Sequence, residues 1–567
     1  MEKINKIKKK INSLKLDGYI IPKNDEFFGE YVPEYKDNLK YLTNFSGSYG
    51  FALILKKKNY IFVDGRYSLQ AKNQCGNFFD VLTIPKYFPS DAIKGKNLKI
   101  GFDPKLFTER MLRLLFKSNY KDLIPLKYNL VDQIKNIKKK ANNKDFFLLN
   151  NKDAGKKNTM KINQVLKILK KSKVDTQFVS APENVAWLLN LRGNDSEYSP
   201  IPNGYLIIEK NNVILFCNKN KIKKRLKKIK IIDINYLEIF LRGLKNKRML
   251  LDNKTCSIYF KNIINVNNKI IRLEDPIYFL KSIKNKTEIR NTIKSHIIDG
   301  AALTKFLFWI KNNFNKKKIT EISAENKLLE LRKKNKNFFS SSFPTISGSG
   351  PNGAIIHYKA NNESNRVLKE NDIYLIDSGG QYRFGTTDVT RTLSLNNKDK
   401  RIKNIFTRVL KGHIAVADFN INNKTTGSDI DPVARKSLQE IGLDYAHGTG
   451  HGVGYFLNVH EGPQAISREN KIKLQEGMII SNEPGYYENN KFGIRIENLI
   501  TVKKKKNNFK FVNLTMAPIE KSLIEKKLLN KKEIKWLNEY HAHVFKNLKK
   551  FMSKLELSDL KKACSNI

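Results

Sequence analysis

Five residues able to bind metal ions lie in segments of this chain that otherwise read as buried strands or glycine-rich turns. They are Asp377, Asp388, His451, Glu483 and Glu497, in IYLIDSGG, GTTDVTRT, HGTGHGVG, IISNEPGYY and GIRIENL. A carboxylate in apolar surroundings costs free energy unless it is paired, hydrogen-bonded or bound to a metal. Four carboxylates and one imidazole can balance two divalent cations, so the sequence predicts the dinuclear metal centre of a hydrolase.

The length and the order of elements indicate several domains. At 567 residues the chain is too long for one hydrophobic core. Up to about residue 145, helices alternate with short strands, and FALIL-KKKN-YIFV predicts a hairpin. The order helix, strand, helix, hairpin then recurs, which indicates two similar α/β modules. We expect domains at 1–150, 151–280 and 281–567.

The third domain differs in its pattern. A long helix with an i, i+4 ridge of Ile289, Ile293, Ile297 and Ala301, suited to packing against a sheet, opens it. Strands and glycine-rich turns follow to about residue 503, and the C-terminal segment is helical again. Helices followed by a strand-rich block are typical of an α+β domain.

The formal net charge of +52 is the most unusual feature of the composition. One interpretation is binding to nucleic acid or to an anionic membrane. The excess is mostly lysine, however, spread in runs such as KIKKRLKKIK without interleaved arginine and aromatic residues. Abundant Asn and Ile, also encoded by A/T-rich codons, favour compositional drift. We expect no specific nucleic-acid partner and no membrane partner.

The cysteines and apolar segments indicate a soluble, cytoplasmic protein. The four cysteines are far apart and form no CxxC pair, which argues against a disulfide framework or a thiolate zinc site. The basic N-terminal segment lacks the continuous apolar run of a secretory signal. No run approaches the roughly 20 apolar residues that a membrane span needs.

The spacing of the acidic residues suggests how they meet. Asp377 ends an apolar strand and Asp388 follows eleven positions later, so an antiparallel hairpin can place them opposite one another. The alternative is that both aspartates only cap turns. In GIRIEN the strand period places Arg495 and Glu497 on one face, where Arg495 can hold a ligand carboxylate. The alternative there is a surface salt bridge.

Histidines accumulate in the same part of the chain. His447 and His451 are four apart, but the glycines around them argue against a helical two-histidine metal site. His357 and His460 lie in the same region and, with His447, can stabilise an oxyanion or transfer a proton beside an activated water. His413 lies in a predicted helix and is interpreted as structural.

These segments together resemble the long, three-domain Xaa-Pro aminopeptidases (aminopeptidase P) of the pita-bread metallopeptidases. The matching segments are FVDGRYSLQA, ENVAWLLNLRG, FPTISGSGPNGAIIHY, DSGGQYRFGTTDVTRT, YAHGTGHGVGYFLNVHEGP, NEPGYYENNKFGIRIENL and LTMAPIEKSLIEKKLLNKKEIKWLNEYHA. The match is weakest over residues 95–155 and 217–275. The resemblance implies two creatinase-like N-terminal α/β domains followed by a C-terminal pita-bread α+β catalytic domain.

The resemblance also implies roles for single residues. All five metal ligands match, with Asp388 and Glu497 reaching both metals and Glu483 acting also as general base. Histidines that contact the substrate or the tetrahedral intermediate match three positions: His357, His447 and His460. Arg495 matches an arginine behind the ligands, and Tyr487 is a further candidate for substrate binding.

The implied reaction removes the N-terminal residue from peptides with proline in the second position (Xaa-Pro-Yaa), by attack of a metal-bound hydroxide on the scissile carbonyl. The implied cofactors are two divalent metal ions, Mn²⁺ before Zn²⁺ or Co²⁺. The implied partners are peptides with an N-terminal Xaa-Pro and, by analogy with long relatives, a second copy in a homodimer.

Three alternatives differ from this expectation. A prolidase, which cleaves Xaa-Pro dipeptides, uses the same ligand set, but the doubled N-terminal modules and HGTGHGVGYFLNVHEGP favour the aminopeptidase. A methionine aminopeptidase would lack those large modules. A non-catalytic pita-bread scaffold binding a nucleic-acid or protein partner would suit the charge, but such proteins typically lose metal ligands, and this chain keeps all five.

Overall fold

The structure is a computed structural model that describes residues 1–567 except 96, 138–141, 143, 225 and 506–507. The chain forms two compact units. Unit 1 consists of residues 1–150 and 156–278, and unit 2 of residues 151–155 and 279–567. The finer division into domains at 1–150, 151–280 and 281–567 stays a prediction.

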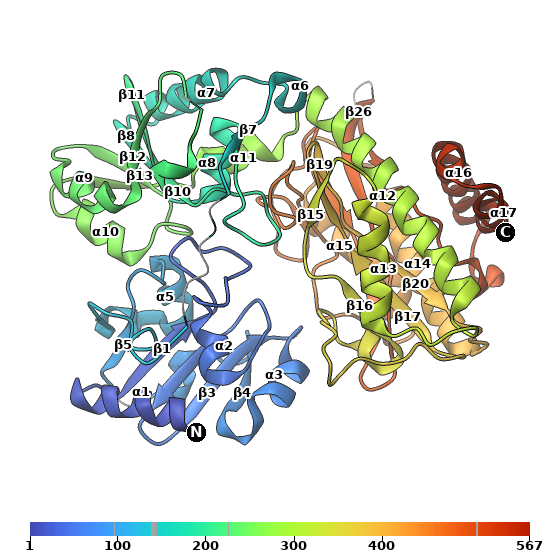
Figure 1. Ribbon diagram of the computed structural model, residues 1–567, viewed down its shortest axis with the longest axis horizontal. Coiled ribbons are helices and arrows are strands. Elements are labelled where there is room, and N and C mark those ends of the chain that lie inside the picture. Colours follow the sequence, from blue (N-terminus) through green and yellow to red (C-terminus); the bar gives the residue numbers. More distant parts are fainter. Residues whose placement is uncertain (96, 138–141, 143, 225, 506–507) are drawn as a thin grey trace. The chain divides into compact units, whose positions relative to one another are not determined.

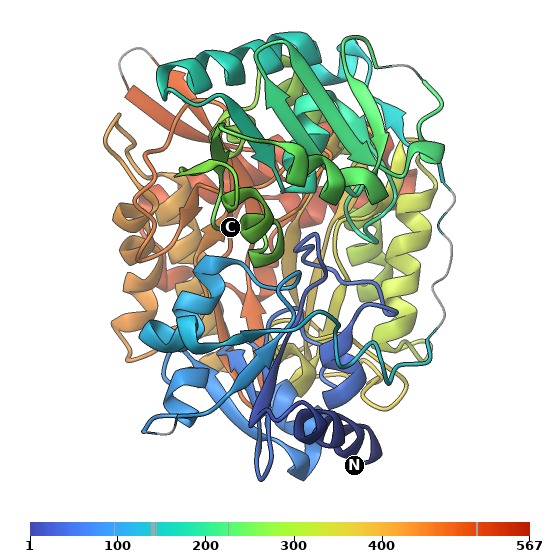
Figure 2. The ribbon, with the colours of Figure 1, turned by 90° about the vertical axis from the view of Figure 1, so that its left-hand side faces the viewer.

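Unit 1 contains two six-stranded sheets of the same topology, drawn in blue and in teal to green in Figure 2. Their orders are β4-β3-β2-β1-β5-β6 and β12-β11-β10-β8-β13-β14. In each sheet two antiparallel pairings lie at the centre and the outer pairings are parallel. The prediction of two similar α/β modules is therefore confirmed.

The strands of the first sheet are β1 Gly18–Pro22, β2 Phe51–Leu55, β3 Asn59–Asp64, β4 Asp80–Ile84, β5 Ile100–Phe102 and β6 Ile124–Pro125. Those of the second are β8 Thr176–Val179, β10 Gly204–Glu209, β11 Asn212–Cys217, β12 Lys230–Asp233, β13 Arg248–Leu251 and β14 Lys269–Arg272. The predicted hairpin of the first module is the β2–β3 pair. Two short strands, β7 Phe147–Leu148 and β9 Leu191–Arg192, pair with each other.

Several helices of unit 1 are amphipathic and bury one face, whereas α8 is buried all round apart from Glu183. The N-terminal helix α1 buries Ile4, Ile7 and Ile11, which follow the helical period. The helices are α1 Glu2–Ser13, α2 Asn38–Thr43, α3 Ser68–Cys75, α4 Pro89–Ala92, α5 Glu109–Phe116, α7 Asn158–Lys171, α8 Pro182–Leu189, α9 Leu237–Gly243 and α10 Ile258–Asn265. Helix α6 (Asn151–Ala154) belongs to unit 2, and the residues of α11 (Pro276–Ser282) are divided, with 276–278 in unit 1 and 279–282 in unit 2.

Unit 2 combines long helices with short strands, as the α+β pattern predicts (Figure 1). Its long helices are α12 Lys286–Asn313, α13 Glu321–Lys333, α14 Lys400–Ala417, α15 Gly427–Gln439, α16 Lys531–Leu548 and α17 Lys554–Cys564. Its strands are β15 Phe338–Ser341, β16 Ile346–Ser349, β17 Ile373–Ser378, β18 Gly380–Tyr382, β19 Gly385–Thr386, β20 Val389–Ser394, β21 Gly450–His451, β22 Ala465–Ile466, β23 Ile479–Asn482, β24 Gly485–Glu488, β25 Phe492–Arg495, β26 Asn498–Lys505 and β27 Asn508–Asn513. The strands form small sheets, of which β16-β17-β20 and β23-β26-β27 contain or directly adjoin Asp377, Asp388, Glu483 and Glu497.

The predicted isoleucine ridge of α12 is partly wrong. Ile293 is 37% exposed, whereas Ser295 and Asp299 are buried. Asp299 accepts two hydrogen bonds from the buried guanidinium of Arg332, of 2.8 and 3.1 Å. Helix α12 therefore turns Ser295 and Asp299 toward the interior at this point. The buried Asp299 carboxylate is tolerated because the Arg332 guanidinium pairs with it.

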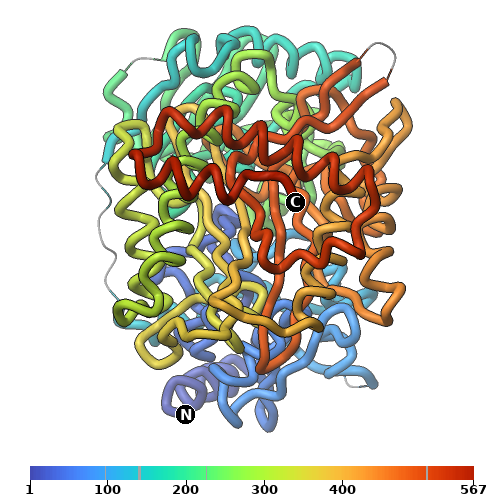
Figure 3. The backbone as a smooth tube through the Cα atoms, turned by 90° about the vertical axis from the view of Figure 1, so that its right-hand side faces the viewer, coloured from blue at the N-terminus to red at the C-terminus, as the bar shows by residue number. Residues whose placement is uncertain are grey.

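The C-terminal helices α16 and α17, dark red in Figure 3, lie next to one another on the outside of unit 2. Buried residues of α16, among them Leu537 and Val544, join a large apolar cluster with α14 and β25. Among the described residues, no helix is both long and apolar enough to cross a membrane.

Candidate metal centre

Strands β17 and β20 bring the two aspartates together. Asp377 is opposite Thr390 in the antiparallel pair, and Asp388 lies just before β20. The aspartates are therefore diagonal neighbours, not direct opposites as expected. The register differs because β18 and β19 form their own small hairpin in the connecting segment, and β20 pairs with β17 only from Val389 onward.

Arg495, at the end of β25, connects the strands behind these carboxylates. Its Nη2 donates to Oδ2 of Asp377 at 2.6 Å, and its Nε donates to the Thr390 hydroxyl at 3.0 Å. That hydroxyl in turn donates to Oε2 of Glu497 at 2.8 Å. The remaining Nη1 donates to the Tyr487 hydroxyl at 2.6 Å. The contact expected between Arg495 and a carboxylate of the predicted ligand set is present, and both groups are buried rather than at the surface.

His451 enters the site from β21, on the side of β23. Its Nε2 lies 3.4 Å from Oδ2 of Asp388 and 3.4 Å from Oε1 of Glu483. Its Nδ1 is 2.9 Å from the Gly452 carbonyl, so Nδ1 carries a proton, and Nε2 is the ring nitrogen that faces the carboxylates and can bind a cation once its own proton is lost. Ser481 supports both residues, because its hydroxyl accepts from the His451 amide at 2.9 Å and donates to Glu483 at 3.0 Å.

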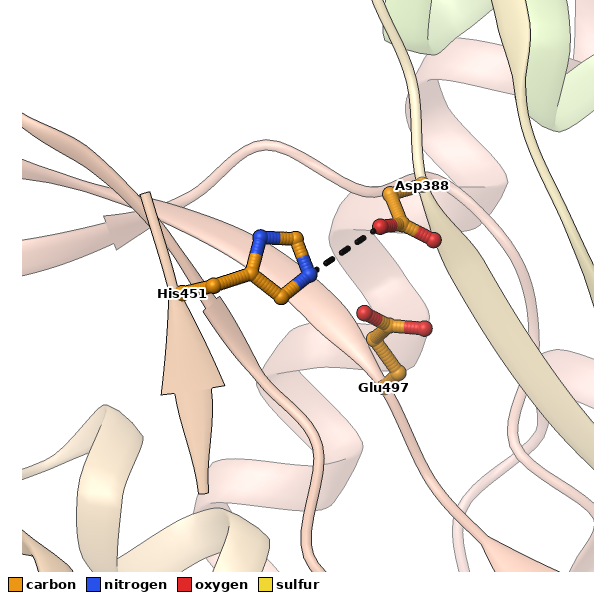
Figure 4. Close-up of side chains that lie close together, drawn as sticks. All are labelled: Asp388, His451 and Glu497. Atoms are coloured by element: carbon orange, nitrogen blue, oxygen red, sulfur yellow. Dashed lines mark ion pairs between the residues drawn. The ribbon is translucent and has the colours of Figure 1, made fainter. Parts of the chain in front are cut away.

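Figure 4 shows the imidazole of His451 facing the carboxylates of Asp388 and Glu497 across a common space. One ligand atom from each of the three lies within 4.8 Å of the other two. The second oxygen of Asp377, Oδ1, is buried and has no hydrogen-bond donor among the described residues. A buried oxygen without a donor and an imidazole nitrogen that faces carboxylates both fit a site for divalent cations.

The electrostatics of the cluster support the same fit. Burial raises the pKa of Asp377 to about 7, although Arg495 opposes the shift. Burial and the neighbouring acids together raise the pKa of Glu497 well above its usual range. Burial would lower the pKa of His451, but Asp388 and Glu483 outweigh it and raise that pKa to about 9. The carboxylates are thus crowded enough that cations would relieve their repulsion.

Two of the three histidines that the resemblance places beside the substrate contact this cluster or the residues that support it. The ring of His460 lies 4.3 Å, centroid to centroid, from the ring of His451. His447 Nε2 is 2.9 Å from the Tyr487 hydroxyl, which also accepts from Arg495. Residues 445–449 form no helix, in agreement with the expectation from their glycines.

His357 follows the short 3-10 helix η5 (Gly350–Ala354) and is half-buried. Its neighbours Ile355 and Tyr358 belong to a small apolar cluster that also includes Tyr487. The backbone of η5 approaches the backbone of β25 so closely that position 493 requires glycine, because a Cβ at Gly493 would lie 1.8 Å from the Gly353 carbonyl oxygen. This close approach places the segment of His357 beside the apolar cluster that Tyr487 also contacts.

His413 lies in α14 and is fully buried, as its interpretation as structural implies. Its ring Nδ1 is 3.1 Å from the Asn482 carbonyl, and the Asn482 amide donates to the His413 carbonyl at 2.9 Å. Burial lowers the pKa of His413 to about 3, so the ring is neutral. This reciprocal pair fixes the end of β23 directly before Glu483.

The sequence interpretation missed Thr390 and Thr392. Thr390 bridges Arg495 and Glu497, and the Thr392 hydroxyl donates to the Arg495 carbonyl at 2.9 Å. Their spacing of two from Asp388 was the available signal, since alternate residues of a strand share one face.

Models of known families cover nearly the whole chain. The metallopeptidase family M24 matches residues 290–504, and the C-terminal region of peptidase M24 matches residues 507–567. Two models of the creatinase/prolidase N-terminal domain match residues 3–134 and 136–288.

Curated relatives are similar over almost their full length. A probable Xaa-Pro aminopeptidase P of Laccaria bicolor is 38% identical, with 96% of this chain and 90% of the relative covered. Xaa-Pro aminopeptidase 1 of Dictyostelium discoideum is 35% identical, with 96% and 92% covered.

Solved structures agree with these matches. The X-prolyl aminopeptidase of Caenorhabditis elegans, described as a cytosolic enzyme with a di-nuclear active site, aligns with a TM-score of 0.94 at 31% identity. The alignment covers 100% of this chain and 99% of that one. An Xaa-Pro dipeptidase of Bacillus anthracis shares the fold over 64% of this chain, with a TM-score of 0.54 and 22% identity. The strand-borne ligand cluster, the two creatinase-like N-terminal modules and these full-length similarities show that the chain belongs to the Xaa-Pro aminopeptidases of metallopeptidase family M24.

Proposed function

We propose that this protein is a dinuclear metal-dependent aminopeptidase that removes the N-terminal residue from peptides with proline in the second position. The observation that carries the proposal is the convergence of Asp388, His451 and Glu497 within 4.8 Å, in a chain similar over its full length to Xaa-Pro aminopeptidases. Asp377 and Glu483 adjoin the same cluster through Arg495 and His451.

Two divalent ions would be held by the five residues named from the sequence: Asp377, Asp388, His451, Glu483 and Glu497. Such ions supply Lewis-acid activation of water and of a peptide carbonyl. Carboxylate and imidazole ligands suit Mn²⁺, which we propose as the native metal, with Zn²⁺ or Co²⁺ as alternatives.

Glu483 is the proposed proton acceptor. Its side chain is 17% exposed, compared with 11% for Asp377 and 5% for Asp388. Burial raises the pKa of Glu483, which suits a group that must accept and later release a proton near neutral pH. Its Oε1 accepts from Ser481 at 3.0 Å, which fixes the direction of the carboxylate.

His357, His447 and His460 are the proposed substrate-side groups, and Tyr487 is proposed to bind substrate beside them. The Tyr487 hydroxyl accepts from Arg495 and therefore directs its own proton to His447 Nε2. Arg495 is assigned to hold Asp377 and to neutralise part of the buried negative charge.

The proposed domains, cellular location, partners and oligomeric state are based on the same relatives. We propose three domains at 1–150, 151–280 and 281–567, a cytoplasmic location, peptides with an N-terminal Xaa-Pro as partners, and a homodimer. The two separate sheets of unit 1 support the division of the N-terminal part. The cytosolic description of the worm enzyme supports the location.

The test is to strip purified protein of metal with a chelator, restore Mn²⁺, Zn²⁺ or Co²⁺ separately, and assay Xaa-Pro-Yaa, Xaa-Pro and Met-Ala peptides. We expect metal-dependent cleavage of Xaa-Pro-Yaa, with Mn²⁺ the most effective. Cleavage of the Xaa-Pro dipeptide alone would instead identify a prolidase.

A further inference from the structure

A single buried arginine of α15 holds the backbone on both sides of Ala446, directly before His447. Arg435 is 4% exposed. Its Nη1 donates to the Tyr445 carbonyl at 2.8 Å, and its Nη2 donates to the His447 carbonyl at 2.6 Å. The planar guanidinium has donors fixed in a fork, so it sets the spacing and direction of both carbonyls.

Asp431, one helical turn earlier, fixes the guanidinium in turn. Its Oδ2 accepts from Arg435 Nε at 2.7 Å, and its Oδ1 accepts from Nη2 at 3.2 Å. The same Oδ1 accepts from the Thr449 hydroxyl at 2.7 Å. The pair therefore also holds the segment that follows His447.

Thr449 extends this connection to the proposed proton acceptor. Its carbonyl accepts from the Glu483 amide at 2.8 Å. The Asp431–Arg435 pair is thus linked to the backbone of His447 and, through Thr449, to the backbone of Glu483. Neither partner belongs to the ligand cluster itself.

Ring contacts complete the support. The Arg435 guanidinium lies 4.0 Å from the ring centre of Tyr445, and the Tyr445 ring lies 4.8 Å from that of His447. Arg435 thereby contacts the loop through two carbonyls, one aromatic face and the Asp444 carboxylate, whose Oδ1 accepts from Nη1 at 2.8 Å. A lysine has no planar fork and could not make all of these contacts while also pairing with Asp431.

We propose that the Asp431–Arg435 pair is a positioning clamp that fixes His447 relative to Glu483 and Tyr487 and so sets the rate of the reaction without contacting substrate. This inference rests on the proposed function. An ordinary ion pair within a helix would not account for the two carbonyls and the hydroxyl that it engages across residues 445–449.

The test is Arg435→Lys in the wild-type and in a His447→Ala background, with Mn²⁺-loaded protein and an Xaa-Pro-Yaa peptide. The matched control is Arg408→Lys, because Arg408 also donates to a backbone carbonyl, that of Ser437, and to a carboxylate, that of Glu440. We expect Arg435→Lys to lower kcat by about 10- to 100-fold in the wild-type background, since small misplacements of catalytic groups have effects of this size. In the His447→Ala background we expect less than about a threefold further loss, because the clamp acts through His447.

A milder variant guards against loss of folding. Thr449→Val removes one hydroxyl from Asp431 and keeps the ion pair, and we expect about a three- to tenfold loss with the same dependence on His447. A second readout, on Zn²⁺-loaded protein because paramagnetic Mn²⁺ broadens nearby signals, is the imidazole NMR resonance of His447, identified by its absence in His447→Ala. We expect it to shift in Arg435→Lys and not in Arg408→Lys.

Equal losses in both backgrounds, or an unmoved His447 resonance in Arg435→Lys, would overturn the clamp. A wild-type protein that binds Mn²⁺ but cleaves no Xaa-Pro-Yaa peptide would refute the proposed function instead. The NMR comparison would still decide whether the pair positions His447.

Discussion

The proposed metal ligands and the three histidines proposed to contact substrate are positioned by different means. All five proposed ligands lie in strands or directly beside them: Asp377 in β17, Asp388 before β20, His451 in β21, Glu483 after β23 and Glu497 before β26. The three histidines lie in loops: His357 after η5, His447 after α15 and His460 between β21 and β22. Backbone pairing therefore places the ligands, whereas other side chains must hold the loops.

A buried charged side chain stands next to each histidine loop. Glu321 accepts from the Ser349 amide and the Tyr358 hydroxyl around the loop of His357. Arg435 holds the carbonyls before and at His447. The residue after His460, Glu461, is buried between two lysines, with oxygen–nitrogen distances of 2.5 Å to Lys284 and 3.4 Å to Lys281. Buried charges with several partners can fix irregular backbone that lacks strand pairing.

The largest effect on activity is expected from removing the negative charge of a proposed metal ligand that is positioned by strand pairing. Asp388→Asn should lower kcat on Xaa-Pro-Yaa by at least ~1000-fold, because the variant loses a ligand and the Lewis-acid contribution that depends on it. Metal content and kcat would be measured together. The control is Asp559→Asn, a distant aspartate of α17 that contacts Asn312. An Asp388→Asn protein with full metal content and full activity would contradict the ligand assignment.

Arg495→Lys tests the connection between strands. Lysine cannot contact Asp377, Thr390 and Tyr487 together, so we expect kcat to fall by roughly 100-fold while the protein stays folded. Metal affinity, measured by titration of stripped protein, should fall as well. If affinity and kcat both matched the wild type, backbone pairing alone would suffice to place Asp377.

Glu321→Gln tests the loop of His357. The carboxylate accepts from the Ser349 and Arg366 amides at 2.7 and 2.9 Å, and an amide group would face one of these donors with another donor. We expect kcat/KM to fall about tenfold with metal content unchanged.

The control is Glu330→Gln, an exposed position on the same helix. A parallel loss of metal in Glu321→Gln would show that loop and ligand positions are not separable.

The smallest effect on activity is expected at His413, where a change in stability should appear instead. Burial lowers the pKa of His413 to about 3, so the folded protein keeps the ring neutral. The unfolded chain binds a proton near pH 6.5, and the folded state therefore loses stability as the pH falls below that value, by up to ~1.4 kcal/mol per pH unit. Melting temperatures at pH 7.5 and 5.5 should differ less in His413→Asn than in the wild type. Identical pH dependence in both proteins would show that His413 does not contribute.

Much of the fold follows from local patterns in the chain. The repeated order of helix, strand and hairpin predicted two similar modules, because hydrophobic periodicity and turn residues are local signals. The strand period also predicted that Arg495 would contact a carboxylate of the proposed ligand set, and it contacts Asp377. The ridge of α12 was partly wrong because Asp299 finds a buried partner, Arg332, far along the chain.

The supports of the loops could not be predicted from the sequence. Arg435 and Asp431 look like an ordinary helical ion pair at i, i+4, and only the folded chain shows that they reach Tyr445, His447 and Thr449. The register of β17 and β20 was also out of reach, because the β18–β19 hairpin between them belongs to another sheet. Contacts between residues far apart in the chain produce no periodic pattern in the sequence from which they could be predicted.

The central claim is that the clustered carboxylates and His451 make a two-metal peptidase site. The most direct measurement titrates metal-stripped protein with Mn²⁺ and follows bound metal and Xaa-Pro-Yaa cleavage in the same samples. We predict that cleavage is absent without metal and reaches its maximum as two ions bind per chain, and that Asp388→Asn abolishes both. Full cleavage by protein free of bound metal would contradict the claim.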